Sequence, residues 1–387
     1  MNRFLLILAA TFFLSSCGSV RNWGPGNKGI SDIRSLHYLT SVEIPYNMEF
    51  RETVVGGLSG ITYDHRKKVF YVISDDRSEH SPARFYEVEI GGWQRVPQVD
   101  FKNVIFLQTT TGRQFESRAG FLETLEKGKR PKYNTPDPED IVYIPSHKGF
   151  VWVSEGELDS FNGVKMLVHP SVNLMEAGGR MLYAYPIPKQ LKFGDVSGPR
   201  RNSAIEAVSL SPSEEKLFFC TEEPLIEDAP SLDSYDTGFV RIYQYRNTSR
   251  SSEAFYAYPL DIPNDPSIVH SDRKFGISAL CALSDSTLLV LERAFIPGEG
   301  NKVRLFKVEL KTENRVRTRK PLLVEKDYIP LEKSLVLDFN TLEDFPIDNI
   351  EGMCLGPVVD GKQTVVFVSD NNFNESQKTI FYLFRTY

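Results

Sequence analysis

Acidic residues recur at two equivalent places in a unit of about twenty residues that occurs five times along the chain. The first place opens a small or apolar run, and the second closes a β-branched and aromatic run 16, 16, 16, 14 and 19 residues further on. The first place is held by Ser59, Glu139, Glu206, Ser278 and Glu351, and the second by Asp75, Glu155, Glu222, Glu292 and Asp370. Chance is a poor explanation for five acids in five equivalent places, because only 51 of the 387 residues are acidic.

Carboxylates gathered in this way predict a site for a divalent cation. Like charges repel one another unless a cation or arginines offset them. Calcium and magnesium both prefer carboxylate, amide and carbonyl oxygens, and we expect Ca²⁺. The predicted ligands are Asp75, Glu139, Glu155, Glu222, Glu292, Asp370 and Asn371. The alternative is that these residues are solvated turn and strand-end residues that cap neighbouring backbone groups.

Hydrolysis is the chemistry that such a cation would support. A divalent ion offsets phosphate charge and activates water. Glu206 or Glu351 is the predicted general base, and Arg77 or Arg293 is predicted to hold a phosphate group. The same ion could act on the carbonyl oxygen of a carboxylic ester or lactone. A third reading is a surface receptor that binds sugar or peptide without turnover.

Other catalytic signatures are weak. Gly57-Leu58-Ser59-Gly60 departs from the Gly-x-Ser-x-Gly elbow, and a strand follows it where the elbow needs a helix. The six histidines form no ligand pair at helical or hairpin spacing, and there is no phosphate loop or dinucleotide fingerprint. Ser59 is therefore expected to be an ordinary inner-strand residue.

Each repeated unit reads as a β-hairpin, and the hairpins must position the acids. Strands in a hairpin are antiparallel, so the start of the first and the end of the second lie at the same sheet edge. Five hairpins around one axis would bring up to eight carboxylates to one mouth. This pattern predicts an all-β propeller with five four-stranded units.

Outer strands are expected to complete these units. The expected ranges are 84–90 and 99–107, 165–168 and 180–187, 240–245 and 254–260, 303–310 and 322–328, and 379–384. An insertion over 160–179 is expected to form a loop at the mouth. The last unit lacks a fourth strand, which the strand over 37–44 can supply. A sixth blade is the alternative, if residues 334–342 form an irregular extra unit.

The N-terminus is predicted to be a targeting segment and not part of the fold. Arg3, an apolar run over 4–14 and then Leu14-Ser15-Ser16-Cys17 resemble the lipobox of bacterial lipoproteins, whereas a plain secretory signal is the alternative. We expect a signal peptide over 1–17, with Cys17 acylated, a flexible tether over 18–35, and one propeller domain over 36–387. Gly18 after the cysteine is associated with outer-membrane retention, so the expected location is the cell envelope, anchored by lipid alone.

The net charge limits the classes of binding partner, and the positions of the cysteines indicate their state. The net charge of −6 disfavours nucleic acid, which is held by surplus Lys and Arg. The expected partner is a small molecule, such as a phosphorylated compound, bound to a monomer. Cys220, Cys281 and Cys354 fall in expected strands and are predicted to be buried thiols.

The order of the short motifs resembles the phytase-like family, named for the esterase-like activity of phytase, from about residue 40 to the C-terminus. The motifs are Gly57-Leu58-Ser59-Gly60-Ile61 with Ser74-Asp75-Asp76, Pro138-Glu139-Asp140-Ile141 with Ser154-Glu155, Ile205-Glu206-Ala207 with Thr221-Glu222-Glu223, Leu291-Glu292-Arg293, and Asn349-Ile350-Glu351-Gly352 with Ser369-Asp370-Asn371-Asn372-Phe373. Asp140 stands where Gly is expected. The resemblance implies a propeller and the hydrolysis of phosphoesters.

Overall fold

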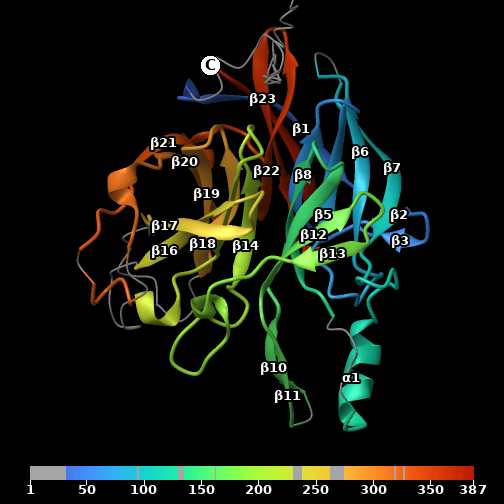
Figure 1. Cartoon of the computed structure of the whole chain (residues 1–387). Helices are drawn as coiled ribbons and strands as arrows, with labels where there is room; N and C mark the ends of the chain where they lie inside the picture. The colour runs from blue at the N-terminus through green and yellow to red at the C-terminus, as the bar shows by residue number, and fades with distance from the viewer. Residues whose placement is uncertain are drawn as a thin grey trace, which may run out of the picture.

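Five four-stranded antiparallel sheets follow one another around a common axis in the computed structural model (Figure 1). The structure describes residues 32–93, 96–129, 135–161, 163–229, 238–261, 274–317, 320–325 and 327–387. The chain is thus a five-bladed β-propeller, as the repeated hairpins predict. The lipobox and most of the tether lie outside the described residues. No helix in the described ranges is long and apolar enough to cross a membrane.

The blades are built in chain order, with the innermost strand first in each. Blade 1 holds β4 (Leu58–Asp64), β5 (Val69–Ser74), β6 (Arg84–Gly91) and β7 (Gln98–Phe106). Blade 2 holds β8 (Pro138–Ile144), β9 (Gly149–Ser154), β12 (Ser171–Glu176) and β13 (Met181–Ala184). Blade 3 holds β14 (Ile205–Leu210), β15 (Lys216–Thr221), β16 (Phe239–Arg246) and β17 (Ser251–Pro259). Blade 4 holds β18 (Lys274–Ala282), β19 (Thr287–Ile296), β20 (Gly300–Glu309) and β21 (Lys333–Asp338).

Blade 5 joins the two ends of the chain. It consists of β22 (Ile350–Val359), β23 (Lys362–Ser369), β24 (Thr379–Thr386) and the N-terminal strand β1 (Leu36–Ile44). β1 pairs antiparallel with β24, from Leu36 opposite Thr386 to Ile44 opposite Thr379. The predicted closure is therefore confirmed.

The apolar core lies between neighbouring blades. Alternating β-branched and aromatic residues on the strands face the next sheet, which gives one buried cluster for each pair of adjacent blades. The five inner strands also contact their neighbours around the axis. Gly60 allows one such approach, because a Cβ there would lie 2.5 Å from the Cα of Asp140. Cys220, Cys281 and Cys354 are buried free thiols, as predicted.

Two expected strands are wrong. In blade 2 the third strand is β12, which lies inside the predicted insertion, whereas residues 165–168 belong to a separate hairpin of β10 (Glu157–Phe161) and β11 (Val164–Val168). In blade 4 the fourth strand is β21 and not 322–328. β21 comes from the segment that suggested an extra blade, so a sixth blade does not form.

A few elements lie outside the blades. The helix α1 (Arg118–Glu126) starts at the cap Ser117 and packs its Phe121 against Met166 and Val168 of the β10–β11 hairpin. α1 and this hairpin project from the same end of the propeller (Figure 1). Other such elements in the described ranges are the small hairpin β2 (Glu49–Phe50) and β3 (Thr53–Val54) and the 3₁₀ turns Lys189–Leu191, Ile226–Asp228, Thr312–Asn314 and Phe339–Thr341.

Candidate functional site

A β-bulge interrupts the pairing of the inner strand in every blade, at the first of the two repeated places. The pairing skips a residue between Leu58 and Gly60 in blade 1, and equivalent breaks occur in the other four blades. A bulge leaves the extra residue unpaired and re-aims its side chain. The residues left unpaired in this way include Ser59, Glu139, Glu206, Ser278 and Glu351.

In each blade, the last inner-strand residue before the bulge pairs with a residue near the end of the second strand. The second repeated place is the residue that directly follows this partner. The pairs that define it are Leu58 with Ser74, Pro138 with Ser154, Ile205 with Thr221, Ile277 with Glu292, and Ile350 with Ser369. The residues that follow are Asp75, Glu155, Glu222, Arg293 and Asp370. The equivalent residue in blade 4 is thus Arg293 and not Glu292.

The structure does not bring Glu292 to the mouth. Successive side chains of a strand point to opposite faces, so a slip of one residue turns a side chain away. The Glu292 carboxylate instead accepts hydrogen bonds from Lys333 Nζ (2.5 Å), the Tyr258 hydroxyl (2.5 Å) and the Asp261 amide (2.9 Å). It joins blades 3 and 4 and is already neutralised by Lys333.

Two further predicted ligands, Asp370 and Asn371, do not line the mouth cavity. The Asn371 side-chain oxygen accepts hydrogen bonds from the Gly57 amide (3.0 Å) and the Phe373 amide (3.2 Å), so it fixes the backbone of blades 1 and 5. Asp370 is 1% exposed and accepts a hydrogen bond from the Asn372 amide (2.8 Å). It is also hydrogen-bonded to Glu351, which raises the pKa of Asp370 in addition to the effect of burial.

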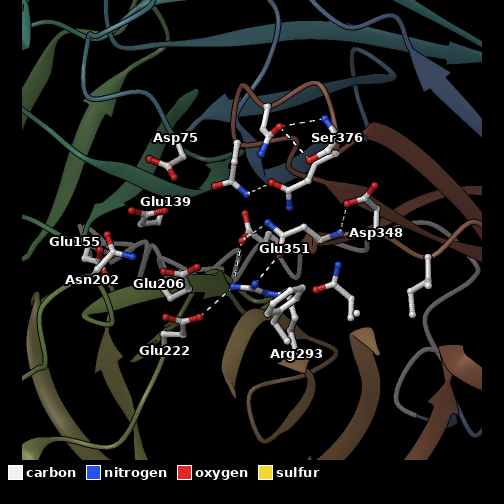
Figure 2. A pocket seen from close by; sticks show the side chains of 18 of the residues that line it. Asp75, Glu139, Glu155, Asn202, Glu206, Glu222, Arg293, Asp348, Glu351 and Ser376 are labelled. Atoms are coloured by element: carbon white, nitrogen blue, oxygen red, sulfur yellow. Dashed lines mark hydrogen bonds and ion pairs between the residues drawn. The ribbon is translucent and has the colours of Figure 1, made fainter. Parts of the chain in front are cut away.

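The remaining predicted residues converge on a cavity of about 780 Å³ at the mouth. Figure 2 shows an arc of carboxylates, with Arg293 and Glu351 beside it; the arc consists of Asp75, Glu139, Glu155, Glu206 and Glu222. The predicted residues that line the cavity are Asp75, Arg77, Glu139, Glu155, Glu206, Glu222, Arg293 and Glu351. Eight of the eleven predicted metal or catalytic residues therefore share one site.

One part of this site contains carboxylates without hydrogen bonds. Carboxylate oxygens of Asp75, Asp137 and Glu139 all lie within 4.8 Å of one another. Asp137 is 1% exposed, and within the described part of the chain neither of its carboxylate oxygens has a hydrogen-bond partner. Arg77 NH2 lies 2.6 Å from Asp137 Oδ2 and forms an ion pair with it.

The opposite part of the site is internally neutralised. Arg293 donates hydrogen bonds to Glu222 Oε1 (3.0 Å) and Asn349 Oδ1 (2.6 Å), and it lies 3.2 Å from Glu351 Oε1. Asn349 also donates to Glu351 (2.9 Å). Within the described residues, Arg293 Nε is buried and keeps no hydrogen-bond partner.

Burial and mutual repulsion raise the pKa of the ring carboxyls. Burial is the main cause at each, and neighbouring acids add to it. Asp75 is raised further by Asp137, Glu139 by Asp75, and Glu206 by Glu222. Below them on β8, burial raises the pKa of Asp140 to about 8, although its carboxylate accepts hydrogen bonds from the Val208 and Ile141 amides.

Sequence reasoning missed Asp137 and the polar wall of the cavity. Asp137 lies two residues before the first repeated place of blade 2, where the other blades have no acid, so the repeat itself did not select it.

The Ser59 hydroxyl donates to the Glu139 carbonyl of the next blade (2.5 Å), as expected of an inner-strand residue and not of a nucleophile.

Comparison with known proteins places the chain in a family. A search of curated proteins finds no match. A family model does match most of the chain, over the same blades that carry the acidic ring. It spans residues 53–373 and is described as phytase-like, esterase-like activity of phytase, and the chain therefore belongs to this phytase-like family.

Proposed function

We propose that the protein is a divalent-cation-dependent hydrolase of phosphoric esters, acting in the cavity at the mouth. The single observation that carries this proposal is the cluster of Asp75, Asp137 and Glu139, whose carboxylate oxygens lie within 4.8 Å of one another. Carboxylates this close repel one another, and the ion pair of Asp137 with Arg77 offsets only part of their charge, so a bound cation would stabilise the cluster.

The donor set fits calcium. Two oxygens bound to one Ca²⁺ are at most about 5 Å apart, since each bond is about 2.3–2.6 Å long, and the three carboxylates satisfy this limit. Asp75, Asp137 and Glu139 would hold the ion. When bound, it would offset phosphate charge and lower the pKa of water.

Glu206 is the residue best suited to accept a proton. It lines the cavity, it makes no hydrogen bond to the described residues through its carboxylate, and it lies close enough to Glu139 to raise the pKa of that carboxyl. Burial and the neighbouring Glu222 raise the pKa of Glu206, which favours uptake of a proton. Glu351 is occupied by Arg293 and Asn349, so we assign it a supporting position.

Arg77 is suited to hold the phosphate. It lines the cavity, and within the described residues its NH2 atom alone is engaged, with Asn202 (3.0 Å), Asp137 (2.6 Å) and Glu155 (3.9 Å). Its remaining N–H groups can donate to a phosphate oxygen. In the reaction the water oxygen forms a new bond to phosphorus, its proton passes to Glu206, and the phosphorus bond to the alcohol oxygen breaks. The departing alcohol takes a proton from solvent in the open cavity.

The proposal is tested by assaying purified protein on chromogenic phosphomonoester, phosphodiester and carboxylic-ester substrates, with chelator or with added Ca²⁺. We expect calcium-dependent phosphate release that Glu206→Gln reduces by roughly a hundredfold or more, as for loss of a general base. Asp195→Asn, an exposed carboxylate outside the cavity, is the matched control.

Equal turnover in chelator and in calcium, or wild-type activity of Glu206→Gln, would refute the proposal. Hydrolysis of the carboxylic ester alone would assign the site to that substrate class. Tight sugar or peptide binding without any turnover would favour a receptor.

We further propose that the protein is exported and attached to the outer membrane by lipid at Cys17.

A further inference from the structure

The face opposite the mouth is formed by turns at the other end of the blades. The first strand of each blade starts at the mouth, so the turn that joins it to the second strand lies at the opposite end, together with the β6–β7 turn of blade 1. Both ends of the propeller chain lie here, because β1 begins beside Tyr387, whose amide donates to the Ser35 carbonyl (3.3 Å). Figure 1 shows the C-terminus at the end of the propeller opposite α1.

Basic side chains are concentrated on one side of this face. They come from blades 1, 2 and 5, and none of them forms an ion pair with another described residue. These residues are Arg66 and Lys68 in the β4–β5 turn, Lys148 in the β8–β9 turn, Lys362 at the start of β23, and Arg385 near the end of β24. Among the described residues of these turns, Asp360 is the one exposed acid. This side of the face is therefore positive, although the net charge of the chain is −6.

The turns of blades 3 and 4 on the same face do not share this charge. They carry the acids Glu214, Glu215 and Asp285, and Lys216 is paired there with Glu253 (2.5 Å). The positive charge is thus confined to the side on which β1 enters the propeller, and it lies at the opposite end from the acidic mouth.

Exposed apolar side chains lie among the basic residues. Val96 in the β6–β7 turn is 73% exposed and Val358 near the end of β22 is 58% exposed, and Tyr387 is as exposed as Val96. The turns of blades 1 and 5 are neighbours, because a Cβ on Gly356 would lie 3.5 Å from the half-buried ring of Trp93. Valine, tryptophan and tyrosine beside Lys and Arg are typical of surfaces that enter the headgroup region of a bilayer.

The part of the chain outside the described residues leads to this face. The description begins at Asp32, four residues before β1, and Cys17 lies 15 residues upstream of Asp32. Fifteen residues span at most about 50 Å. Lipid attached at Cys17 would therefore keep this face, and not the mouth, within reach of the bilayer.

From these observations we infer that the face opposite the mouth docks on an anionic bilayer. The five basic residues contact lipid phosphate groups, and Val96 and Val358 enter the headgroup region. Each Lys or Arg near an anionic surface adds to the attraction, and buried apolar area adds to it further. The bilayer would then hold the propeller in one orientation. The inference does not depend on the reaction proposed for the cavity, because it concerns the other end of the molecule.

The test measures binding to vesicles by the chain from Gly18 onward, which has no lipid anchor and keeps every residue that the structure describes. We expect it to bind vesicles that contain phosphatidylglycerol and not vesicles of phosphatidylcholine alone. The affinity should fall as salt rises, because salt screens the attraction. Equal affinity for both vesicles, or no affinity for the anionic ones, would overturn the inference.

Variants locate the binding surface. Arg66→Gln/Lys362→Gln should weaken binding to the anionic vesicles by roughly twentyfold, since each basic residue contributes about fivefold. The matched control is Lys189→Gln/Lys192→Gln, which removes the same charge from exposed residues between β13 and β14 on the mouth side. The control should bind like the parent chain. A loss in the control equal to that in Arg66→Gln/Lys362→Gln would contradict the assignment.

The apolar part of the surface is tested separately. Val96→Ser/Val358→Ser should weaken binding by about tenfold and leave its salt dependence unchanged, because it removes apolar area and no charge. Both side chains are exposed, so Tm should remain that of the parent chain. Wild-type affinity of this variant would show that these residues stay outside the bilayer and would overturn their assignment.

A second copy of the chain is the competing occupant, because a basic face could pair with an acidic mouth. Analytical ultracentrifugation without vesicles distinguishes the two. We expect a monomer at every concentration. Self-association that Arg66→Gln/Lys362→Gln abolishes, together with no binding to anionic vesicles, would overturn the inference and assign this face to a head-to-tail contact.

Discussion

Asp137 is buried beside Asp75 and Glu139, and Arg77 is the residue that forms an ion pair with it in the described part of the chain. Asp137→Asn removes one charged oxygen from the three-carboxylate cluster, so the calcium concentration that raises Tm should increase by roughly tenfold or more. Calcium binding to the wild type should stabilise the fold by about 2.7 kcal/mol at a hundred times its Kd. Calcium titrations followed by thermal melting measure both. A wild-type response in Asp137→Asn would show that the ion binds elsewhere, and Asp195→Asn should respond as the wild type does.

The raised pKa values of the buried carboxyls predict an unusual pH dependence of the metal-free protein. In the unfolded chain these groups titrate near about pH 4, whereas Asp140 titrates at about 8 when folded and the ring carboxyls are also raised. The folded state therefore binds more protons above pH 4, and the free energy of unfolding falls as pH rises.

In chelator, Tm should consequently decrease between about pH 5 and pH 8. Added calcium should reduce this decrease, because the ion favours the deprotonated carboxylates. Melting curves at several pH values, with and without calcium, measure the two slopes. A metal-free Tm that rises with pH over this range would contradict the assigned shifts.

At the scale of single elements, the hairpins were predictable from sequence and the bulges were not. Turn residues and β-branched runs identify the inner hairpins, because those signals are local. A bulge changes the register by one residue without changing composition, so the interval of 14 residues in blade 4 led to Glu292. A signal for the correct register was available, because a hydroxyl residue directly precedes the acid in the other four blades. These residues are Ser74, Ser154, Thr221 and Ser369. In blade 4 Glu292 holds the position of this hydroxyl residue.

The outer strands of blades 2 and 4 were harder to predict for a different reason. β11 and β12 have similar composition, and only pairing with β9 makes β12 the blade strand. β21 follows a long connection, so neither spacing nor alternation selects it over 322–328. Asp137 was missed because a site can include a residue that the repeat does not share.

The corrected register of blade 4 makes a separable prediction. Glu292→Gln should lower stability by roughly 1–3 kcal/mol, since Lys333 and the Tyr258 hydroxyl lose their charged partner. The calcium-induced rise in Tm should remain as in the wild type, because Glu292 does not line the mouth cavity. Denaturant unfolding and calcium titration measure the two effects. A weakened calcium response would return Glu292 to the ion site.

On the scale of the whole molecule, stability depends on the pairing of the chain ends. β1 completes blade 5 and contributes Leu36 to the core between blades 4 and 5. Removing residues 1–45 exposes the edge of β24 and opens that core, so the entire domain should melt at a lower temperature in a single transition. A truncated protein that melts like the full chain would show that the ring holds without this closure.

The same strand fixes the face on which the chain enters the propeller. β1 ends at Ile44, opposite Thr379 and close to Gln377 of the cavity wall, whereas it begins at Leu36 on the other face. Nine extended residues span about 30 Å, roughly the depth of the propeller. A chain anchored through lipid at Cys17 would thus enter the propeller on the face away from the cavity, and the mouth would point into solution.

This orientation is measurable with fluorophores on lipid-anchored protein in vesicles that contain headgroup-quenching lipid. A label at Asp360, in the turn between β22 and β23 on the face where β1 begins, should be quenched more strongly than a label at Gly298, in the β19–β20 turn beside the cavity. Cys17→Ala should abolish vesicle binding and the difference in quenching together. Stronger quenching at Gly298 would mean that the mouth faces the bilayer, so the substrate would have to reach it from the membrane surface.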